Sequence, residues 1–284
     1  MQETQKQWEE LTVTDNYLFQ LVMRNPHICK HLIEKILQIH IHEIRYPEFE
    51  KNITVSLRGK SIRLDVYVED DTGKVYDIEM QCLDKGVDEI SLRARYYQSL
   101  LDVEMMEKGE SYSQLNASYV IFICTFDPYR AGLAQYTFKR CCLEENAIQS
   151  KDKQMQIFLN STQADKAKDP DVAAFLRYVD GKAAEGMFAK QVDQEVRYIK
   201  SQENWRWNYM KWAMELRVAK EYARQEGRQE GRQEGREEGK RENQHETASR
   251  LLSLGVAPKT VAEGTGLSLE EVQAIVQITE KTKA

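Results

Sequence analysis

Acidic side chains concentrate on two neighbouring segments of this chain. Asp65 and Glu79 lie fourteen positions apart, and Gln81 follows two positions after Glu79. Between them, residues 70–74 have the sequence DDTGK, a short turn pattern in which the glycine can adopt a positive φ. Apolar and polar residues alternate on both sides of this turn, which is the period of a β-strand with one buried face. The sequence therefore predicts a β-hairpin whose polar face carries the acids.

A turn centred on Thr72 determines which residues of the two strands lie opposite each other. The predicted apolar pairs are Val66–Ile78 and Leu64–Met80, and the predicted polar pairs are Asp65–Glu79 and Arg63–Gln81. Opposed Cβ atoms lie only about 4.5–5.5 Å apart, and like charges at that spacing are destabilising. A divalent cation with oxygen ligands would remove the repulsion. The alternative is a solvated polar face on an edge hairpin.

The spacing of Asp65, Glu79 and Gln81 resembles the motif of the PD-(D/E)xK nuclease superfamily. The surrounding sequence, in order from Thr12 to Lys240, resembles the Rpn group of recombination-promoting nucleases, which are putative transposases of that superfamily. The matching segments are TDNYLFQLVM (14–23), LDVYVEDDTGKVYDIEMQ (64–81), RARYYQSLLDVEMMEKGESYSQL (93–115), SYVIFICTFDPY (118–129), YTFKRCC (136–142) and NWRWNYMKW (204–212). The resemblance implies a metal-dependent DNA endonuclease that acts in recombination or mobile-element biology.

The resemblance also implies which residues act. Asp65 and Glu79 would bind Mg²⁺ or Mn²⁺, and Gln81 would hydrogen-bond the attacking water or a phosphate oxygen. Gln81 stands where the superfamily has lysine, and an amide cannot serve as a general base. Asp15, at the start of the first predicted helix, would contribute a further carboxylate. The alternative for Asp15 is an N-cap, and the two roles are compatible.

Arg93 and Tyr97 are four residues apart on a helix that we expect to begin at a cap by Asp88 and to end near Lys108. They therefore share one helix face. The resemblance marks both as typical of the group. Arg93 would contact a DNA phosphate or orient Glu79, and the alternative is an arginine that stacks on Tyr97 and packs the helix against the sheet.

The remaining patterns predict an α/β fold: a restriction-endonuclease-like mixed sheet flanked by helices, then a long helical extension and a small helical module. Two helices, separated at Asn25-Pro26, precede the hairpin, and helical patterns dominate after Asp171. The expected additional strands are 53–57, 119–124 and 156–159. The expected domains are 1–200 (nuclease-like core), 201–245 (extension) and 246–284 (module).

The extension carries a Gln-Glu-Gly-Arg tandem that begins at Gln225. Each glycine costs a helix about 1 kcal/mol relative to alanine, which favours a frayed helix or a linker. The glycine stripe would also permit close helix–helix approach, so a homodimer through the C-terminal helical region is the competing interpretation. The last module resembles a helix-turn-helix, with a capping box at Ser268 and Glu271. Its acidic charge favours protein interaction or self-association over base readout.

Composition bounds the possible partners. The chain has 284 residues, a formal net charge of −6 and five cysteines without metal-ligand spacing. No apolar run approaches the roughly 18 residues that span a bilayer, and the N-terminus lacks a signal-peptide pattern. We therefore expect a cytoplasmic protein that contacts no membrane. Its partner would be DNA, bound through local basic patches, a metal or oligomerisation. The alternatives are an inactive or toxin-like DNA-associated regulator of this fold, or a self-associating scaffold.

Overall fold

The computed structural model describes residues 6–46, 52–53 and 62–281. The chain divides into two compact units, one that ends at Met210 and one that begins at Lys211. The candidate acids all belong to the first unit. No described helix is both long enough and apolar enough to span a bilayer.

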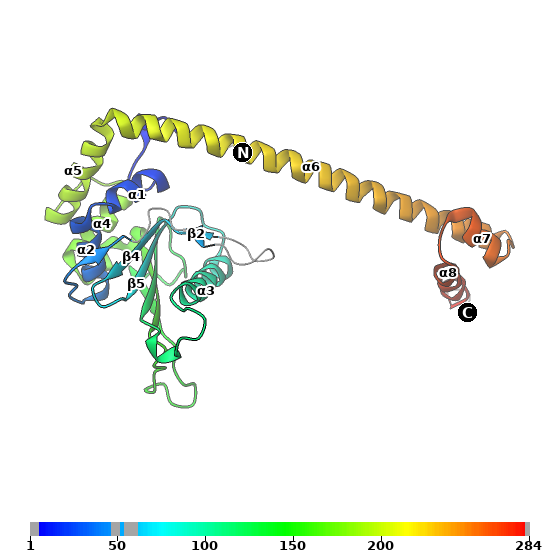
Figure 1. Cartoon of the computed structure of the whole chain (residues 1–284), viewed down its shortest axis with the longest axis horizontal. Helices are drawn as coiled ribbons and strands as arrows, with labels where there is room; N and C mark the ends of the chain where they lie inside the picture. The colour runs from blue at the N-terminus through cyan, green and yellow to red at the C-terminus, as the bar shows by residue number, and fades with distance from the viewer. Residues whose placement is uncertain (1–5, 47–51, 54–61, 282–284) are drawn as a thin grey trace. The chain divides into compact units, whose positions relative to one another are not determined.

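A mixed six-stranded sheet forms the centre of the first unit (Figure 1). Its strand order is β1-β4-β5-β6-β8-β7, in which β5–β6 and β6–β8 are parallel and the outer pairs are antiparallel. The strands are β1 (Ile44–Arg45), β4 (Val66–Asp70), β5 (Val75–Gln81), β6 (Ser118–Cys124), β7 (Gln135–Phe138) and β8 (Gln154–Asn160). The predicted α/β class and two of the predicted strands, here β6 and β8, are confirmed.

Helices cover both sides of this sheet. α3 lies on one side of the sheet, and α1, α2 and α4 lie on the other (Figure 1). The helices of the first unit are α1 (Asn16–Met23), α2 (Pro26–Leu37), α3 (Val87–Glu104), α4 (Pro170–Val179), α5 (Met187–Ser201) and the start of α6 (Glu203–Ser253). Asn25 caps α2 by accepting from the backbone N–H of His27 at 3.1 Å, so the predicted separation of the first two helices is confirmed.

The β4–β5 hairpin has the predicted register over its paired residues. Val66 lies opposite Ile78, and Tyr67 opposite Asp77. The prediction of one continuous first strand from residue 62 is wrong, because the chain bends at Asp65 before β4 begins. Residues 62–63 form β3 (Ile62–Arg63), which pairs with β2 (Asn52–Ile53) in a separate small sheet. Arg63 therefore lies opposite Asn52 instead of Gln81, and Leu64 has no strand partner at Met80. Beyond Ile53, the strand predicted over 53–57 lies outside the described residues.

The hairpin is buried on both faces, which corrects the prediction of a single buried face. β5 lies between β4 and β6, and α3 covers the face that carries Tyr67, Asp77 and Glu79. These three residues are 4 %, 0 % and 1 % exposed. A strand inside a sheet with helices on both sides has no solvated face. The acids therefore lie in a covered interior and not on a wet edge.

α3 begins within two residues of the predicted cap and ends four residues before the predicted end. Gly86, at a φ of 93°, precedes the helix, and Asp88 lies within its first turn, so Asp88 is not the cap. The helix ends at Glu104, before the predicted end near Lys108. Only glycine adopts such a φ readily, which is why the chain turns into the helix at this residue.

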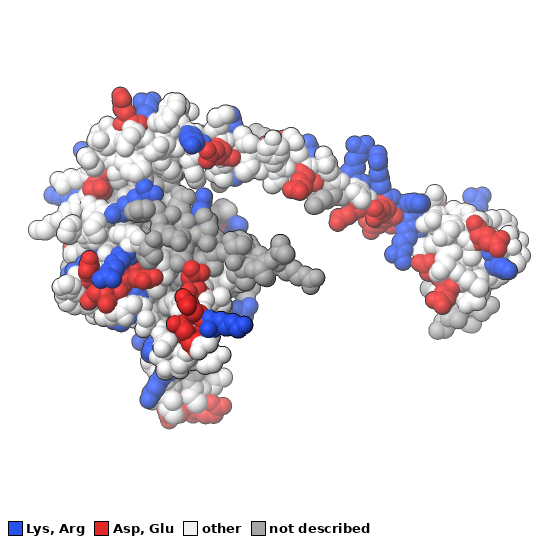
Figure 2. All heavy atoms as spheres, viewed as in Figure 1, with Lys and Arg blue, Asp and Glu red and all other residues white. Residues whose placement is uncertain are grey.

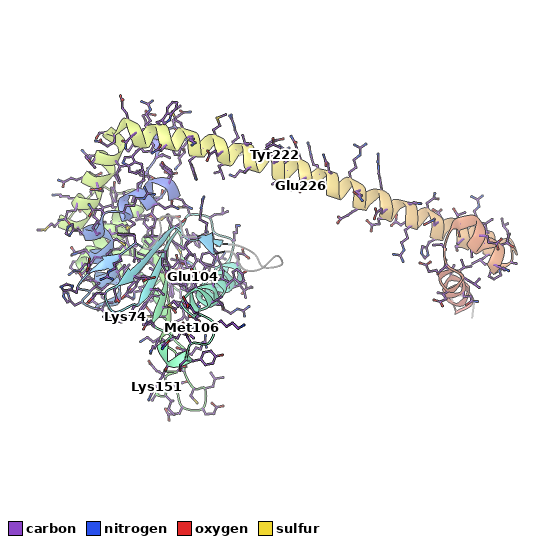
Figure 3. The ribbon with its side chains drawn as sticks, viewed as in Figure 1. Lys74, Glu104, Met106, Lys151, Tyr222 and Glu226 are labelled. Carbon is purple, nitrogen blue, oxygen red and sulfur yellow. The ribbon has the colours of Figure 1, made fainter. Side chains whose placement is uncertain are left out.

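The Gln-Glu-Gly-Arg tandem lies within α6, which is a continuous helix from Glu203 to Ser253. Its glycines do not interrupt the helix, so the frayed-helix prediction from local propensity is wrong. Tyr222, just before the tandem, and Glu226, in its first repeat, lie about one helical turn apart (Figure 3). The end of α6 packs with α7 (Pro258–Thr265) and α8 (Leu269–Lys281) around the small core of Ala248, Val261, Leu267 and Val272.

The predicted capping box at the start of α8 is confirmed. The backbone N–H of Ser268 donates to Glu271 Oε2 at 2.9 Å, and the backbone N–H of Glu271 donates to Ser268 Oγ at 3.2 Å. These reciprocal bonds satisfy two donors that the first helical turn leaves free.

The N-terminal segment is fastened to the last helices of the first unit. Trp8 is buried, and its indole N–H donates to the carbonyl of Lys200 at 3.2 Å. The Lys200 ammonium in turn donates to the carbonyls of Glu9 and Leu11 at 2.7 and 2.8 Å. Tyr209 Oη donates to the carbonyl of Lys6 at 2.8 Å. These contacts therefore join the N-terminal segment to the C-terminal helices of the same unit.

Candidate active site

Asp65 and Glu79 form an interlocked pair at the point where β4 begins. The backbone N–H of Asp65 donates to Glu79 Oε1 at 2.8 Å, and the backbone N–H of Met80 donates to Asp65 Oδ2 at 3.2 Å. The bend at Asp65 makes this possible, because its N–H leaves the strand ladder and turns to the Glu79 carboxylate. Both residues are buried, with Asp65 8 % exposed. The structure thus brings together the two acids that the sequence pairs.

Arg93 joins this pair from α3. Its guanidinium donates to Glu79 Oε2 and to Gln81 Oε1, each at 2.6 Å. Its Nε donates to Tyr97 Oη at 2.9 Å. The guanidinium carbon also lies 4.9 Å from the ring centroid of Tyr97 and 5.2 Å from that of Phe122, within cation–π range. Arg93 therefore both contacts Glu79 and stacks on the Tyr97 ring, although the sequence suggested these as alternatives.

Gln81 lies at the more accessible end of the site. Its side chain is partly exposed, and its amide nitrogen donates to the carbonyl of Leu83. Arg93 is also partly exposed, with 32 % of its side chain accessible. A ligand from solvent would therefore meet Gln81 and Arg93 before it met the buried carboxylates.

Asp15 contacts residues outside the Asp65–Glu79 pair. It occupies the N-cap position of α1, but its carboxylate accepts no hydrogen bond from that helix, so the capping hydrogen bond that the sequence suggests is absent. Asp15 Oδ2 instead accepts from the backbone N–H of Thr12 at 2.7 Å, and Asp15 Oδ1 pairs with the Lys6 ammonium at 2.8 Å. Its described hydrogen bonds and ion pair join it to these neighbours and not to Asp65 or Glu79.

Gln20 is a neighbour of the acids that the sequence did not reveal. It lies on α1, is 7 % exposed, and its amide donates to Asp65 Oδ1 at 3.2 Å. A glutamine on the buried face of an otherwise apolar helix was the available signal. A buried amide requires hydrogen-bonding partners, and here the partner is the acid across the layer.

The electrostatics of the site favour a bound positive charge. Burial and the Asp65 carboxylate raise the pKa of Glu79 from 4.5 to about 8, although Arg93 acts in the opposite direction. Burial also raises the pKa of Asp65, against the hydrogen bonds from Met80 and Gln20. Two buried carboxylates with raised pKa values disfavour their joint ionisation, and a nearby cation favours it.

Oxygen donors at this position suit a hard divalent cation. Among the described residues, no three His, Cys, Asp or Glu side chains converge as a metal-holding group. Mg²⁺ does not require three, because it is usually bound through one or two carboxylates together with water and substrate phosphates. Asp65 and Glu79 supply two adjacent carboxylates, and each has lone pairs beyond those used by its described hydrogen bonds. The residues present therefore fit such an ion.

Comparison with protein families identifies the group to which this arrangement belongs. A family model described as PD-(D/E)XK nuclease family transposase matches residues 16–179. The chain belongs to this family. The match begins with α1 and ends with α4, so it contains Asp65, Glu79, Gln81 and Arg93. No curated protein and no solved structure gives a significant match. The PD-(D/E)XK assignment supports a nuclease or transposase-like role with DNA as the substrate, in a family that generally uses divalent metals.

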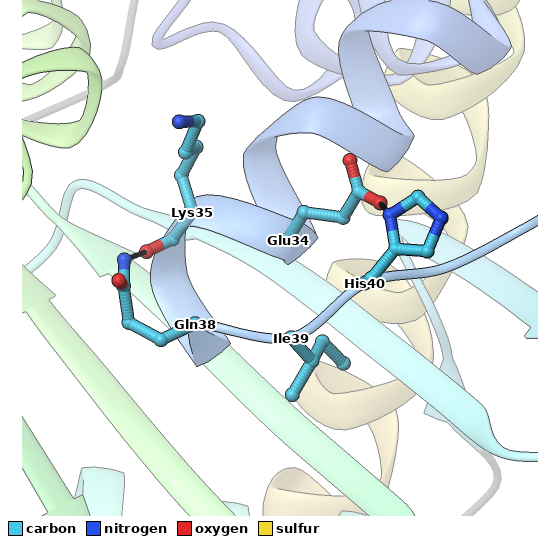
Figure 4. A pocket seen from close by; sticks show the side chains of 5 residues that line it. All are labelled: Glu34, Lys35, Gln38, Ile39 and His40. Carbon is cyan, nitrogen blue, oxygen red and sulfur yellow. Dashed lines mark hydrogen bonds and ion pairs between the residues drawn. The ribbon is translucent and has the colours of Figure 1, made fainter.

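The surface pocket at the end of α2 is separate from this site. It encloses about 270 Å³ and is lined by Glu34, Lys35, Gln38, Ile39 and His40 (Figure 4). Glu34 pairs with His40 at 3.1 Å, and Gln38 donates to the carbonyl of Lys35 at 2.6 Å. Its polar groups bond to one another and, through Lys35 and Gln38, to Asp169 and Asp171, and no described contact joins them to the acids of the PD-(D/E)XK motif.

Basic side chains are dispersed across the visible surface. On the face shown in Figure 2, Lys and Arg side chains are interspersed with Asp and Glu side chains. This agrees with the net charge of −6. Nonspecific DNA affinity depends mainly on lysine and arginine near phosphates, and on this face these side chains stand among acidic ones.

We expect Arg93→Ala to lower the free energy of unfolding by about 2 kcal/mol. Without the guanidinium, the buried Glu79 Oε2 and the Gln81 Oε1 lose the group that donates to both, and an unsatisfied buried polar group costs about 1–3 kcal/mol. Urea unfolding at pH 7 measures the effect. Arg95→Ala is the matched control, because Arg95 lies exposed on the same helix. Equal stabilities of the two variants would show that Arg93 does not support the acid pair.

Proposed function

We propose that this chain is a metal-dependent DNA endonuclease that hydrolyses phosphodiester bonds. The observation that carries the proposal is the interlocked Asp65–Glu79 pair, buried at the start of β4 and held from α3 by Arg93. In this proposal the two carboxylates hold Mg²⁺ or Mn²⁺. When bound, the ion would polarise the scissile phosphate and lower the pKa of the attacking water.

The remaining residues position the reactants. Gln81 accepts from Arg93 through its amide oxygen, and one of its amide N–H groups donates to the Leu83 carbonyl. Its second amide N–H would donate to a phosphate oxygen or to the attacking water. Arg93 offers its exposed edge to a DNA phosphate while it keeps Glu79 in place. Asp15 is engaged by Lys6 and Thr12, so the proposal rests on Asp65 and Glu79 and does not require it.

The family description supports a biological setting in DNA recombination or mobile-element movement. All five cysteines are free thiols, which agrees with action in the reducing cytoplasm. The direct test is nicking of supercoiled plasmid by the purified full chain, with Mg²⁺ or Mn²⁺ and with EDTA. Cleavage that requires the metal would support the proposal. Absence of cleavage in all three conditions would favour an inactive, DNA-associated relative.

A second proposal is that the chain self-associates through α6. Three apolar side chains spaced by four residues, Met214, Val218 and Tyr222, are 62 %, 43 % and 69 % exposed. An apolar stripe of this kind on an exposed helix favours contact with another apolar surface. A second copy of the same helix would supply one, as in a homodimer.

We expect a Met214→Glu, Val218→Glu double variant to be monomeric where the wild-type chain is dimeric, because acidic groups cannot be buried unpaired in an apolar contact. Light scattering coupled to size exclusion measures the mass. Gln225→Glu with Gln229→Glu adds the same charge at exposed polar positions and is the matched control. A wild-type chain that is monomeric at high concentration would contradict this proposal.

A further inference from the structure

Asp77 is a buried acid that no described N–H group or hydroxyl stabilises. It lies in the middle of β5, is 0 % exposed, and neither carboxylate oxygen accepts a hydrogen bond from a described N–H group or hydroxyl. Among the described residues it is the one acid with both oxygens in this state. Buried polar groups are nearly always hydrogen-bonded, and leaving one unsatisfied costs about 1–3 kcal/mol, more if the group is charged. Because this burial lowers the stability of the fold, we look for a functional reason for Asp77 at this position.

Its position relates Asp77 to the acid pair. Side chains two residues apart on a strand share one face, so Asp77 and Glu79 lie on the same face of β5, beneath α3. The strand neighbours of Asp77 are Tyr67 on β4 and Val120 on β6. Burial, the carboxylates of Glu79 and Asp65, and a side-chain hydrogen bond with Glu79 hold the pKa of Asp77 well above its ordinary value. Asp77 is therefore within electrostatic range of both acids.

Asp70 on the same hairpin shows how this fold satisfies a buried acid that has a structural role. It is 5 % exposed, and its carboxylate accepts from Thr72 N, Thr72 Oγ1 and Lys74 N at 2.8, 2.6 and 3.0 Å, and from Tyr76 Oη at 2.8 Å. Burial opposes ionisation, yet these donors lower the pKa of Asp70 below its ordinary value. Asp70 has four N–H and hydroxyl donors from the protein, whereas no such donor reaches Asp77, whose carboxyl interacts only with that of Glu79 among the described hydrogen-bonding groups.

We propose that Asp77 belongs to the cation site, and that its carboxylate accepts hydrogen bonds from water molecules that the bound ion carries. Mg²⁺ retains much of its water when proteins bind it, and a carboxylate behind the first ligands can accept hydrogen bonds from that water. Asp77 then acts through the ion and its hydration, as a positioning residue beside Asp65 and Glu79. This inference rests on the proposed metal dependence of the nuclease and adds a third acid to it.

Cation binding by the full chain, without DNA, tests the inference independently of cleavage. The melting temperature is measured during titration with MnCl₂, after removal of metal by EDTA and dialysis, for the wild type and for Asp77→Asn, Asp70→Asn and Asp65→Ala. We expect Asp77→Asn to raise the melting temperature of the metal-free protein, because it removes a buried acid that lies against the Glu79 carboxyl. We also expect it to raise the Mn²⁺ concentration at half-maximal stabilisation by about 10–100-fold, the usual effect of removing a group behind the ligands.

The other variants separate the possible outcomes. Asp70→Asn is expected to melt lower and to keep the wild-type Mn²⁺ midpoint, since Asp70 serves the turn. If Asp65→Ala shifts the midpoint but Asp77→Asn does not, the role of Asp77 is overturned while the metal site stands. If the wild type gains no stability from Mn²⁺ or Mg²⁺, the inference and the proposed metal dependence both fail. Asp77→Ser provides a second small polar replacement, with the same expected change in midpoint, if the asparagine variant does not fold.

Discussion

Replacing Asp65 with alanine is expected to lower metal-dependent DNA cleavage by at least about 1,000-fold. A metal ion contributes several kcal/mol to stabilising phosphoryl transfer, and each 1.36 kcal/mol corresponds to a tenfold change in rate. The variant loses one of two adjacent carboxylates and the acceptor of the Met80 N–H. Initial rates of plasmid nicking in saturating Mg²⁺ measure the effect.

The variant should remain folded, because removing Asp65 also relieves its repulsion of Glu79. Circular dichroism and the melting temperature provide that check. Asp71→Ala is the matched control, since Asp71 is an exposed acid in the turn of the same hairpin and should retain wild-type cleavage. Mg²⁺-dependent nicking by Asp65→Ala at the wild-type rate would remove the central claim of the proposed function.

The metal-free protein is expected to lose about 3 kcal/mol of stability between pH 5.5 and pH 8. The pKa of Glu79 is about 8 in the folded protein and 4.5 ordinarily, so in this range the folded chain binds a proton that the unfolded chain has released. Stability linked to this group is complete below about pH 4.5 and is lost as pH rises through 8, at no more than about 1.4 kcal/mol per pH unit. Urea unfolding in EDTA at a series of pH values measures the slope.

Glu79→Gln is the control for this slope, because glutamine does not titrate. The difference between the two pH profiles isolates the contribution of Glu79 from that of other groups. Adding Mn²⁺ at pH 8 should restore stability to the wild type and not to Glu79→Gln. Parallel pH profiles for the two proteins would show that the Glu79 carboxyl is not perturbed in the folded state.

The hairpin illustrates what local pattern can predict. Alternation and the DDTGK turn were sufficient for the register that places Val66 opposite Ile78 and for the nearness of Asp65 to Glu79. They were not sufficient for the bend at Asp65, since the pattern of the chain alternates without interruption through that residue. The bend depends on β2, which pairs with residues 62–63 and draws the preceding segment into another sheet.

The contacts that complete the site come from distant segments, and no local pattern predicts them. The sequence could place Arg93 and Tyr97 on one helix face, but only the packing of α3 on β5 shows that one guanidinium bridges Glu79 and Gln81. Gln20 reaches Asp65 across 45 residues of chain. The short strands β1 and β7 were missed for a related reason: each is specified mainly by the neighbour that it pairs with.

The hydrogen bond between Trp8 and Lys200 determines when the first unit can complete its folding during synthesis. The two residues are 192 positions apart. At a synthesis rate of about 5–20 residues per second, the N-terminal segment waits on the order of 10–40 s for its partner. During that time Trp8 lacks the Lys200 carbonyl and the Tyr209 ring that it contacts in the folded protein, so the first unit closes only when these residues have left the ribosome. Protease cleavage of stalled nascent chains near Trp8, lost once the stall site lies well beyond Tyr209, would reveal this late closure.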